Sequence, residues 1–405
     1  MKKFNKFLSV ALASAMVMAM AGCGNTDNGS AATGTNAATE SAAASDSAAS
    51  GSVFKIGGIG PTTGGAAVYG LAVQHGAEIA VEEINAAGGI NGYQVEFKFQ
   101  DDEADAEKSV NAYNALKDWG AQIIDGSTTS GACIAVTDKT KEDNMFQITP
   151  SGSAVECVQY DNNFRVCFSD PNQGLASAQY IGENGLAEKI AVIYDSSDVY
   201  SSGIYEKFTK EAENQPFEIV AAEAFTADNK TDFSVQLQKA KDAGADMVFL
   251  PIYYQESALI LTQAAAMGYA PKWFSCDGMD GILGGVDNFD VSLTEGVMLL
   301  TPFAADATDD LTQSFVTKYK EKYGETPNQF AADSYDAIYV IKAAIEKSGV
   351  TPDMSVSDIC DGMKAAMTEI TVDGLTGNGM TWTADGEANK APKAVVIENG
   401  AYKAM

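Results

Sequence analysis

A single histidine, His75, limits the chemistry that this chain of 405 residues can carry out. A Ser-His-Asp triad, a histidine-rich metal site or a histidine general base would each have to use it. The pattern around His75 is that of a helix interior, and the chain has no G-x-S-x-G elbow. An exported hydrolase is therefore a disfavoured hypothesis, and we expect the protein not to be an enzyme.

Two other stretches resemble binding motifs only in part. The glycine-rich stretch 58–65 lacks the third glycine of a dinucleotide fingerprint at the required place, and Ala66-Ala67 replace the Lys and Ser/Thr of a P-loop. The alternating acids of 101–107 have calcium-loop spacing, but Ala106 and Ala112 stand where Gly and Glu are required. A solvated helix N-terminus explains these acids better. We expect no cofactor and no metal site.

The composition indicates a large acidic globular protein. Lys and Arg total 26 against 55 Asp and Glu, a formal net charge of −29. Such a chain has no cationic surface for phosphate backbones, so we expect no nucleic-acid partner. Hydrophobic residues make up 46% of the chain, enough for a sizeable core, and the length suits two domains.

The N-terminus has the pattern of an export signal. Lys2, Lys3 and Lys6 precede the apolar run 7–20, and small residues stand directly before Cys23. This order resembles a bacterial lipobox and predicts a signal peptide at 1–22 with a lipid on Cys23. Simple secretion with cleavage nearby is the alternative. Residues 23–52 are rich in Gly, Ala, Ser and Thr and cannot bury enough apolar surface to fold. We therefore predict that they form a disordered tether.

Five cysteines follow Cys23, and an odd number leaves at least one thiol unpaired. They are Cys133, Cys157, Cys167, Cys276 and Cys360. Cys157 and Cys167 flank a predicted turn and are the best candidates for a disulfide, although spacing alone does not fix their separation. The others have the character of small buried hydrophobic residues.

Alternating β-type and helical runs predict parallel sheets covered on both faces. The expected strands and helices of a first series are 54–59, 69–87, 94–100, 104–119, 122–125, 132–142 and 146–149. A second series comprises 189–194, 200–213, 217–224, 233–243, 247–250 and 256–267, before strand 296–300 and helices 311–323 and 330–347.

These late helices are too long to belong to the second series alone, so the chain should pass between two units more than once. We predict two doubly wound α/β lobes joined by three hinge strands. The N-terminal lobe would comprise 53–170 and 302–378, and the C-terminal lobe 171–301 and 379–405. Open sheets of this kind bind ligands at the carboxyl ends of their strands, so the cleft between the lobes is the expected site.

Several stretches resemble the leucine/isoleucine/valine-binding proteins of ABC importers. The stretches are 60–64, 69–70, 84–92, 101–102, 148–151, 164–165, 246–253 and 334–337, and the similarity covers about residues 53–400. The block Asn85-Ala86-Ala87-Gly88-Gly89-Ile90-Asn91-Gly92 is fairly specific to this group and predicts a helix end followed by a tight turn. The resemblance implies a type I periplasmic-binding-protein fold, a free amino acid as ligand, and no catalytic residue.

The resemblance also implies how the ligand carboxylate is bound. Ser130, before a helix, and the turn Ser151-Gly152-Ser153, after the next strand, would supply hydroxyl and backbone N–H groups. Orphan N–H groups and helix N-termini suit a carboxylate on physical grounds as well. The alternative is that Ser130 and Ser153 only cap helices.

For the ammonium group, the resemblance points to Asp277 in the second lobe, with Asp280 as the alternative register. Tyr69, Tyr200 and Tyr253 would form an aromatic clamp with Phe330 as its floor, since aromatic rings cover a ligand at low entropy cost. Packing in the core is the alternative role for these rings.

The function implied is that of an extracytoplasmic substrate-binding lipoprotein, attached to the cell membrane only through its lipid. It would deliver a branched-chain or related neutral amino acid to an ABC permease, as a monomer. Thr128 and Thr129 differ from the more apolar residues common in branched-chain binders. A sensory ectodomain of the same fold, signalling through a partner, is the alternative.

Overall fold

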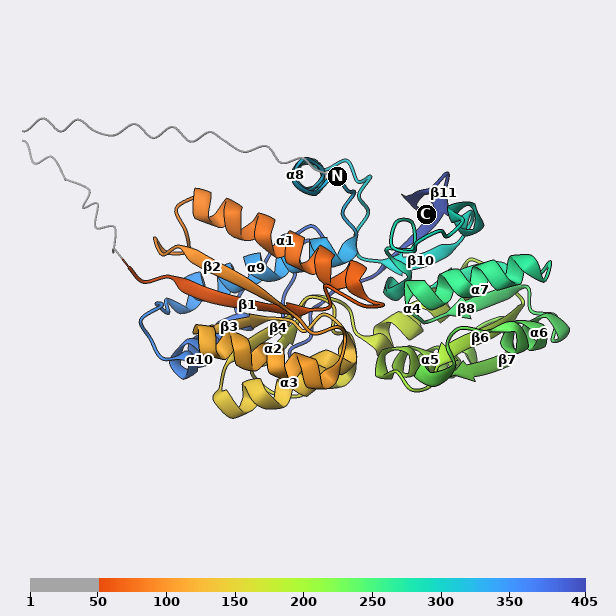
Figure 1. Ribbon diagram of the computed structural model, residues 1–405, viewed down its shortest axis with the longest axis horizontal. Helices are drawn as coiled ribbons and strands as arrows, with labels where there is room; N and C mark the ends of the chain where they lie inside the picture. Colours follow the sequence, from red (N-terminus) through yellow and green to blue (C-terminus); the bar gives the residue numbers. More distant parts are fainter. Residues whose placement is uncertain (1–50) are drawn as a thin grey trace, which may run out of the picture. The chain divides into compact units, whose positions relative to one another are not determined.

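The computed structural model describes residues 51–405. The predicted signal peptide, Cys23 and the tether up to residue 50 lie outside the described residues. Residues 51–405 form two α/β lobes, each built on its own sheet (Figure 1). The predicted fold class of two doubly wound lobes is confirmed. None of the helices in this part of the chain combines the length and apolar character needed to span a bilayer.

The first lobe contains a five-stranded parallel sheet in the order β2-β1-β3-β4-β5. Its strands are β1 (Phe54–Gly60), β2 (Val95–Asp101), β3 (Ile123–Asp125), β4 (Phe146–Thr149) and β5 (Asn163–Arg165). Its helices are α1 (Ala67–Ala86), α2 (Ala106–Trp119), α3 (Ser130–Asp143), α8 (Asp310–Tyr323), α9 (Gln329–Ser348) and α10 (Val356–Met367). Helix α9 packs along α1 although more than 240 residues separate their starts in the chain.

Local signals explain why these helices begin and end where they do. Asp105 caps α2 by accepting hydrogen bonds from the backbone N–H groups of Glu107 and Lys108. The helix ends at Gly120, whose φ of 94° is left-handed and suits glycine. The acidic residues of 101–107 therefore lie at a helix N-terminus, as the sequence predicted, and the structure adds that one of them, Asp105, is the helix cap.

The second lobe contains a seven-stranded sheet in the order β12-β11-β10-β9-β8-β6-β7. Its strands are β6 (Lys189–Asp195), β7 (Glu218–Phe225), β8 (Met247–Leu250), β9 (Lys272–Ser275), β10 (Met298–Thr301), β11 (Lys393–Glu398) and β12 (Ala401–Ala404). Its helices are α4 (Asp170–Glu183), α5 (Val199–Ala212), α6 (Ser234–Asp242) and α7 (Tyr254–Ala266). Strands β11 and β12 join the sheet antiparallel, so it is not purely parallel.

Three passages connect the lobes, between β5 and α4, between β10 and α8, and before β11. The third passage lies later than the predicted boundary at residue 379. The indole N–H of Trp382 still donates to the Arg165 carbonyl, and the Gly386 carbonyl accepts from the Arg165 N–H. Buried Lys390 likewise bonds Asp333 of α9, at 2.6 Å. The chain thus leaves the first lobe only after Lys390, because these buried partners hold it there.

The expected Cys157–Cys167 disulfide is wrong for this structure, in which all five described cysteines are buried free thiols. Cys157 lies in a short 3₁₀ helix, η1 (Val155–Val158), and packs against Cys133 and Ala154. Its thiol donates to the Ser130 carbonyl at 3.7 Å. Cys167 lies past the end of β5 instead, where burial raises the pKa of its thiol well above its ordinary value.

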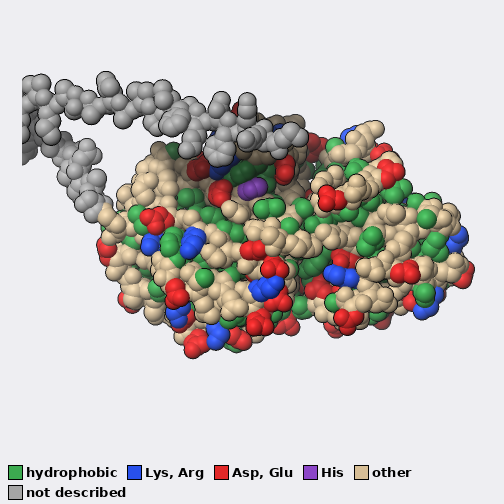
Figure 2. All heavy atoms as spheres, viewed as in Figure 1, with side chains coloured by type: hydrophobic (Ala, Val, Ile, Leu, Met, Phe, Trp, Pro, Cys, Tyr) green, Lys and Arg blue, Asp and Glu red, His purple; other side chains and the backbone are tan. Residues whose placement is uncertain are grey.

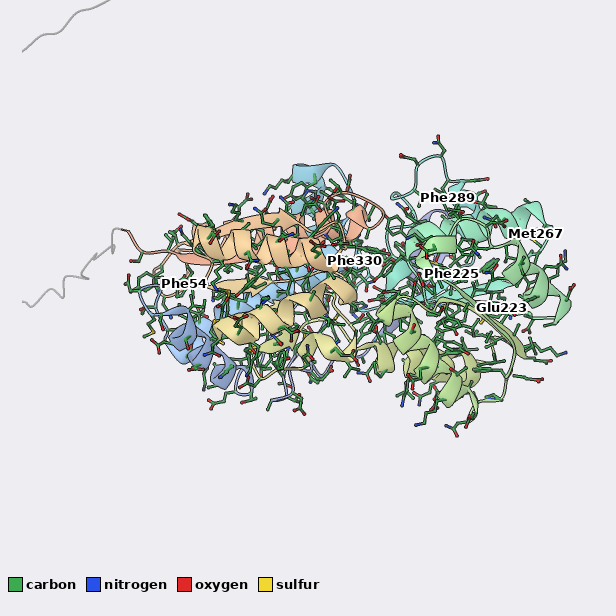
Figure 3. The ribbon with its side chains drawn as sticks, turned by 60° about the horizontal axis from the view of Figure 1, so that its bottom comes forward. Phe54, Glu223, Phe225, Met267, Phe289 and Phe330 are labelled. Atoms are coloured by element: carbon green, nitrogen blue, oxygen red, sulfur yellow. The ribbon has the colours of Figure 1, made fainter. Side chains whose placement is uncertain are left out.

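Acidic side chains are scattered over the visible face of the molecule, with fewer basic ones among them (Figure 2). Phe330, at the start of α9, lies where the two lobes meet (Figure 3). The carboxyl ends of the first lobe's strands face the same region, because Tyr69, Thr128 and Ser151 line one cavity with residues of the second lobe. The fold therefore brings strand ends from both lobes to a shared cleft.

Candidate ligand-binding site

Ser130 and Ser153 lie side by side at the carboxyl ends of neighbouring strands. Ser130 is the first residue of α3, after β3, and Ser153 follows β4. The Ser130 Oγ accepts the backbone N–H groups of Ser153 and Ala154, both at 3.1 Å. Since these two bonds use the oxygen's lone pairs, the hydroxyl hydrogen is left as a donor. A hydroxyl held in this way, at a helix N-terminus, suits a bound carboxylate.

Neither serine caps a helix. The N-cap of α3 is Thr129, and the N-cap of η1 is Ala154. The hydroxyl of Ser153 has no hydrogen-bond partner among residues 51–405, although it is buried. A buried hydroxyl without a partner is unusual in proteins and indicates a role other than holding the fold.

The loop after β4 is fixed from behind by Arg165, which is fully buried. Its guanidinium donates to the carbonyl of Ser153 at 2.5 Å, of Ala154 at 2.8 Å and of Gly152 at 3.2 Å. With its carbonyls turned toward Arg165, the loop can direct N–H groups toward Ser130. Arg165 belongs to one of the stretches that carry the family resemblance, but the resemblance does not imply a role for it in the site.

The other two members of the predicted turn have different surroundings. Ser151 lines the cavity, and its hydroxyl donates to the Thr128 carbonyl at 2.6 Å. Gly152 does not line it, and its N–H donates to the Thr149 hydroxyl at 2.7 Å. A Cβ on Gly152 would lie 2.7 Å from that hydroxyl oxygen, so only glycine fits here without a shift.

On the second lobe, Asp277 lies at the start of a short 3₁₀ helix after β9. Its Oδ1 accepts the hydroxyl of Tyr200 at 2.7 Å, and that hydroxyl accepts the Gly278 N–H at 2.9 Å. Two glutamine side chains bind the backbone of Asp277. Its N–H donates to the Gln173 Oε1 at 3.2 Å, and its carbonyl oxygen accepts from the Gln329 Nε2 at 2.8 Å. Sequence reasoning had not identified Gln173 or Gln329.

Burial raises the pKa of Asp277 to about 7, although bonds from Tyr200 and Gln173 oppose the shift. Ionising a buried carboxyl group costs free energy when no opposite charge is near, so a cationic partner stabilises the ionised form of such a group most. Asp280, the alternative residue, does not line the cavity that contains Asp277. Its carboxylate accepts the Gln329 N–H at 2.9 Å, and it borders a separate groove of about 1030 Å³.

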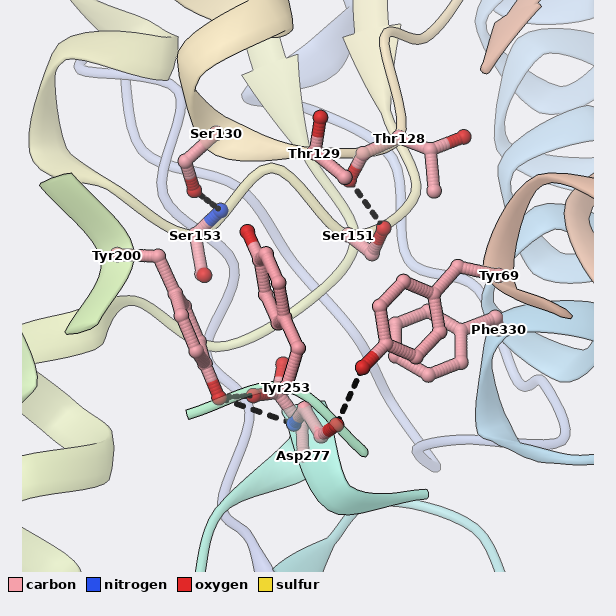
Figure 4. Close-up of a pocket in the computed structure, with 11 residues that line it drawn as sticks. Tyr69, Thr128, Thr129, Ser130, Ser151, Ser153, Tyr200, Tyr253, Asp277 and Phe330 are labelled. Carbon is pink, nitrogen blue, oxygen red and sulfur yellow. Dashed lines mark hydrogen bonds between the residues drawn. The ribbon is translucent and has the colours of Figure 1, made fainter. Parts of the chain in front are cut away.

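Four aromatic rings lie between these polar groups (Figure 4). Tyr253 stacks on Tyr200 with ring centroids 5.0 Å apart and meets Tyr69 edge-on at 5.4 Å. Tyr69 lies against Phe330 at 4.3 Å. The hydroxyl of Tyr69 also crosses to the second lobe, donating to the Gly278 carbonyl and accepting the Tyr254 N–H. These contacts hold the lobes together.

The structure brings eight of the nine predicted ligand residues to one cavity, all except Gly152. The residues lining it are Tyr69, Thr128, Thr129, Ser130, Ser151, Ser153, Tyr200, Tyr253, Asp277, Gly278 and Phe330. The cavity measures about 10 Å³, room for about one water molecule. A ligand of amino-acid size therefore requires the lobes, or the Tyr253 ring, to move.

Comparison with known proteins identifies the family. Residues 53–401 match the family model described as periplasmic binding protein. The chain belongs to the periplasmic binding protein family. The resemblance to the leucine/isoleucine/valine-binding proteins is thereby confirmed, and with it the expectation that the chain is a binding protein of ABC transport, not an enzyme. The family's location is extracytoplasmic.

Two curated family members illustrate the similarity. "Leu/Ile/Val-binding protein homolog 3" of Brucella melitensis is 31% identical over 300 residues, covering 74% of this chain and 80% of its own. The "leucine-, isoleucine-, valine-, threonine-, and alanine-binding protein" of Pseudomonas aeruginosa is 30% identical over 302 residues, covering 73% and 78%.

A solved structure agrees with this family assignment. The substrate-binding protein LivJ of a branched-chain amino acid transporter from Streptococcus pneumoniae was solved in complex with isoleucine. It is 29% identical with a TM-score of 0.79, and the alignment covers 87% of this chain and 98% of LivJ. The similarity thus extends over both lobes and the passages between them.

Proposed function

We propose that this protein is the substrate-binding lipoprotein of an ABC importer and binds a free neutral amino acid between its lobes. Ser130, Ser153 and the loop around them would bind the α-carboxylate, and Asp277 would bind the α-ammonium group. Tyr69, Tyr200, Tyr253 and Phe330 would enclose the ligand once the lobes close.

One observation carries the proposal. The Ser130 hydroxyl, with its lone pairs used by two N–H groups, is a donor on one lobe, and Asp277 on the other is an acceptor with one oxygen unbonded by Tyr200. A zwitterion carries the two complementary charges one carbon atom apart. Leaving either charge unpaired in a buried site costs several kcal/mol, by the usual magnitude for buried ions. The arrangement thus favours an amino acid over a ligand with only one of the charges.

The relatives support a neutral ligand side chain. The Pseudomonas relative is described as binding leucine, isoleucine, valine, threonine and alanine, and the Brucella relative as a homologue of the Leu/Ile/Val-binding protein. Thr128 and Thr129 line the cavity of this protein beside Tyr69 and Phe330. A mixed wall of hydroxyl and aromatic groups suits small or branched neutral side chains of modest polarity.

Binding of the twenty amino acids to the purified protein tests the proposal. Thermal shift detects any ligand, since a ligand at 100 times its Kd adds about 2.7 kcal/mol to the stability. We expect stabilisation by one or a few neutral amino acids, followed by a calorimetric titration with one site. The absence of a shift with every amino acid, in a protein that unfolds cooperatively, would contradict the proposal.

We also propose that a lipid on Cys23 anchors the protein to the outer side of the cell membrane, where it meets its permease as a monomer. The sequence pattern before Cys23 supports the anchor. Changing Cys23→Ser should move the protein from the membrane fraction to the soluble fraction of cells. Persistent membrane association of this variant would contradict the anchor and leave the amino-acid site unaffected.

A further inference from the structure

Cys133 and Cys157 are two buried thiols that pack against each other beside the proposed carboxylate subsite. Together with Ala154 they form a small apolar cluster of their own, apart from the larger cores of both lobes. Cys133 lies in the first turn of α3 and Cys157 in η1, so α3 and the loop that contains Ser153 meet at this pair. The function proposed above uses neither thiol.

The surroundings of the two sulfur atoms differ. The Cys133 Sγ faces a donor, the side-chain amide of Gln147, whose Nε2 lies 3.6 Å away. The Cys157 Sγ faces an acceptor, the Ser130 carbonyl oxygen, at 3.7 Å. A donor stabilises a thiolate, whereas a carbonyl oxygen favours the protonated thiol. The geometry therefore distinguishes Cys133 as the sulfur that ionises and Cys157 as the one that keeps its proton.

The pKa values of the two thiols shift in the same sense. The contact with the Cys157 thiol lowers the pKa of Cys133, while burial opposes that shift. The Thr149 hydroxyl and the positive charge of Arg165 lower this pKa further. Burial and the neighbouring Cys133 raise the pKa of Cys157 well above its ordinary value. Because the thiolate is the reactive form of cysteine, Cys133 is the better nucleophile of the pair.

Access to the pair depends on both lobes. Two half-buried apolar side chains cover the cluster, Ile134 of α3 and Val199 of α5. Val199 belongs to the second lobe, whereas both thiols belong to the first. An opening of the lobes that admits a ligand would therefore take Val199 away from the thiols. A small oxidant could then reach Cys133 while each lobe stays folded.

We propose that Cys133 and Cys157 form a peroxide-sensitive pair that converts to a disulfide. This inference goes beyond the proposed function and does not depend on it. In the first step the Cys133 thiolate attacks one oxygen of hydrogen peroxide, and the O–O bond breaks. The hydroxide that leaves takes up a proton and becomes water. Cys133 is then a sulfenic acid.

In the second step Cys157 reacts with this sulfenic acid. Its sulfur gives up its proton and attacks the Cys133 sulfur, so that an S–S bond forms and the S–O bond breaks. The hydroxide that leaves takes up the thiol proton and becomes the second water. Two sulfur atoms are thus oxidised, and one peroxide is reduced to two molecules of water. The family's extracytoplasmic location lies away from the reductants of the cytosol, so the disulfide can persist there.

The disulfide would join α3 covalently to the loop after β4. In the thiol form, the Ser130 hydroxyl oxygen connects the two segments by accepting the N–H groups of Ser153 and Ala154. Oxidation would also remove the thiol hydrogen that Cys157 donates to the Ser130 carbonyl. The modification would therefore act directly on the segments that form the proposed carboxylate subsite.

The experiment treats the folded, reduced protein with a small molar excess of hydrogen peroxide and then alkylates it in denaturant. Of the five cysteines after Cys23, all should be alkylated before the treatment and three after it. The intact mass should fall by two hydrogen atoms, and peptide mapping should join the peptides of Cys133 and Cys157. In urea, where the pair is no longer held together, peroxide should show no preference for these two residues.

Single variants test the order of the two steps. In Cys157→Ser the sulfenic acid has no second thiol to react with, so peroxide should leave oxygen on Cys133. In Cys133→Ser the nucleophile is lost, so Cys157 should stay a thiol. Cys360→Ser is the matched control, because Cys360 is a buried thiol of α10 in a different core. This variant should form the disulfide as the parent does.

Each result decides the inference. Five remaining thiols in the folded, peroxide-treated parent would overturn it, and so would a disulfide between Cys157 and Cys167. Oxygen on Cys157 in Cys133→Ser would overturn the assignment of Cys133 as the nucleophile. If Cys133→Ser does not fold, Cys133→Ala, which brings no polar atom into the cluster, takes its place. The proposed function fails separately, if the parent protein binds no amino acid at all.

Discussion

The Ser130 hydroxyl oxygen lies 3.1 Å from the Ser153 backbone nitrogen, and the bond between them joins the ends of two neighbouring strands. One side chain thus fixes the loop after β4 and at the same time turns its own hydrogen away from that loop. The proposed carboxylate subsite depends on this bond, since it sets both the loop and the hydroxyl.

We expect Ser130→Ala to lower amino-acid affinity roughly ten- to a hundredfold, because one hydrogen bond to a charged group is lost. The N–H groups of Ser153 and Ala154 also lose their acceptor, so the free energy of unfolding should fall by about 1–3 kcal/mol. Calorimetry and urea denaturation measure the two effects. Ser177→Ala, which removes a buried hydroxyl near Cys276, is the control and should keep the parent affinity. Unchanged affinity in Ser130→Ala would exclude Ser130 as a ligand residue.

The affinity for an amino acid should depend on pH through Asp277. Burial raises the pKa of this carboxyl group to about 7, so below pH 7 it is increasingly protonated and cannot pair with an ammonium group. Binding should therefore weaken as the pH falls from 8 to 5, by at most about tenfold per unit for one group.

Calorimetric titrations at several pH values test this prediction. A 2-hydroxy acid with the same side chain as the bound amino acid should show little of the dependence, and Asp277→Asn should flatten it. A pH-independent affinity for the amino acid between pH 5 and 8 would contradict an ammonium contact with Asp277.

Tyr69→Phe should weaken closure of the cleft without removing the ring. The hydroxyl of Tyr69 bonds Gly278 and Tyr254 across the lobes. Phenylalanine loses these bonds and keeps the ring contacts with Tyr253, Tyr254 and Phe330. We expect roughly a three- to tenfold loss of amino-acid affinity. X-ray scattering should show a larger radius of gyration than the parent at equal, sub-saturating ligand.

Tyr339→Phe provides the control, because the hydroxyl of Tyr339 bonds Glu83 within the first lobe. It should leave both the affinity and the scattering profile as in the parent. If Tyr69→Phe and Tyr339→Phe behave alike, the bonds across the cleft do not contribute to closure.

The thiols provide a test of the cysteine assignment. The five cysteines after Cys23 are buried and unpaired in the structure, so an alkylating reagent should modify them only after unfolding. Alkylation in denaturant without reductant, followed by mass spectrometry, should add five groups to Cys133, Cys157, Cys167, Cys276 and Cys360. Three added groups would instead reveal one disulfide, and peptide mapping would locate it.

Much of the fold follows from local sequence patterns. The apolar run 247–250 and the periodic helix at 330–347 appear close to their predicted bounds, as β8 and α9. Both are buried elements with strong periodicity, which is the most local signal of structure. The helix α4 was not predicted, since Asp170-Pro171 has the composition of a boundary. In the structure Pro171 lies in its first turn, where proline is well tolerated.

The polar members of the site were identified largely through the family resemblance, because Ser130, Ser153 and Asp277 have no local pattern that distinguishes them from other surface residues. The sequence left Asp277 and Asp280 as alternatives. The structure separates them, since three residues along this turn are enough to direct one carboxylate to the cleft and the other to a different groove.

The sequence by itself established the negative net charge and argued against histidine chemistry. It also predicted the two series of strands and helices and, through the family resemblance, named most of the residues that line the cavity. Tertiary structure alone decided which buried groups have partners. Arg165 holds a loop that precedes it in the chain, and Trp382 bonds a residue more than two hundred positions away. Such pairings depend on which distant segments the passages between the lobes bring together. Because these groups are buried, a polar group without a hydrogen-bond partner would lower the free energy of unfolding.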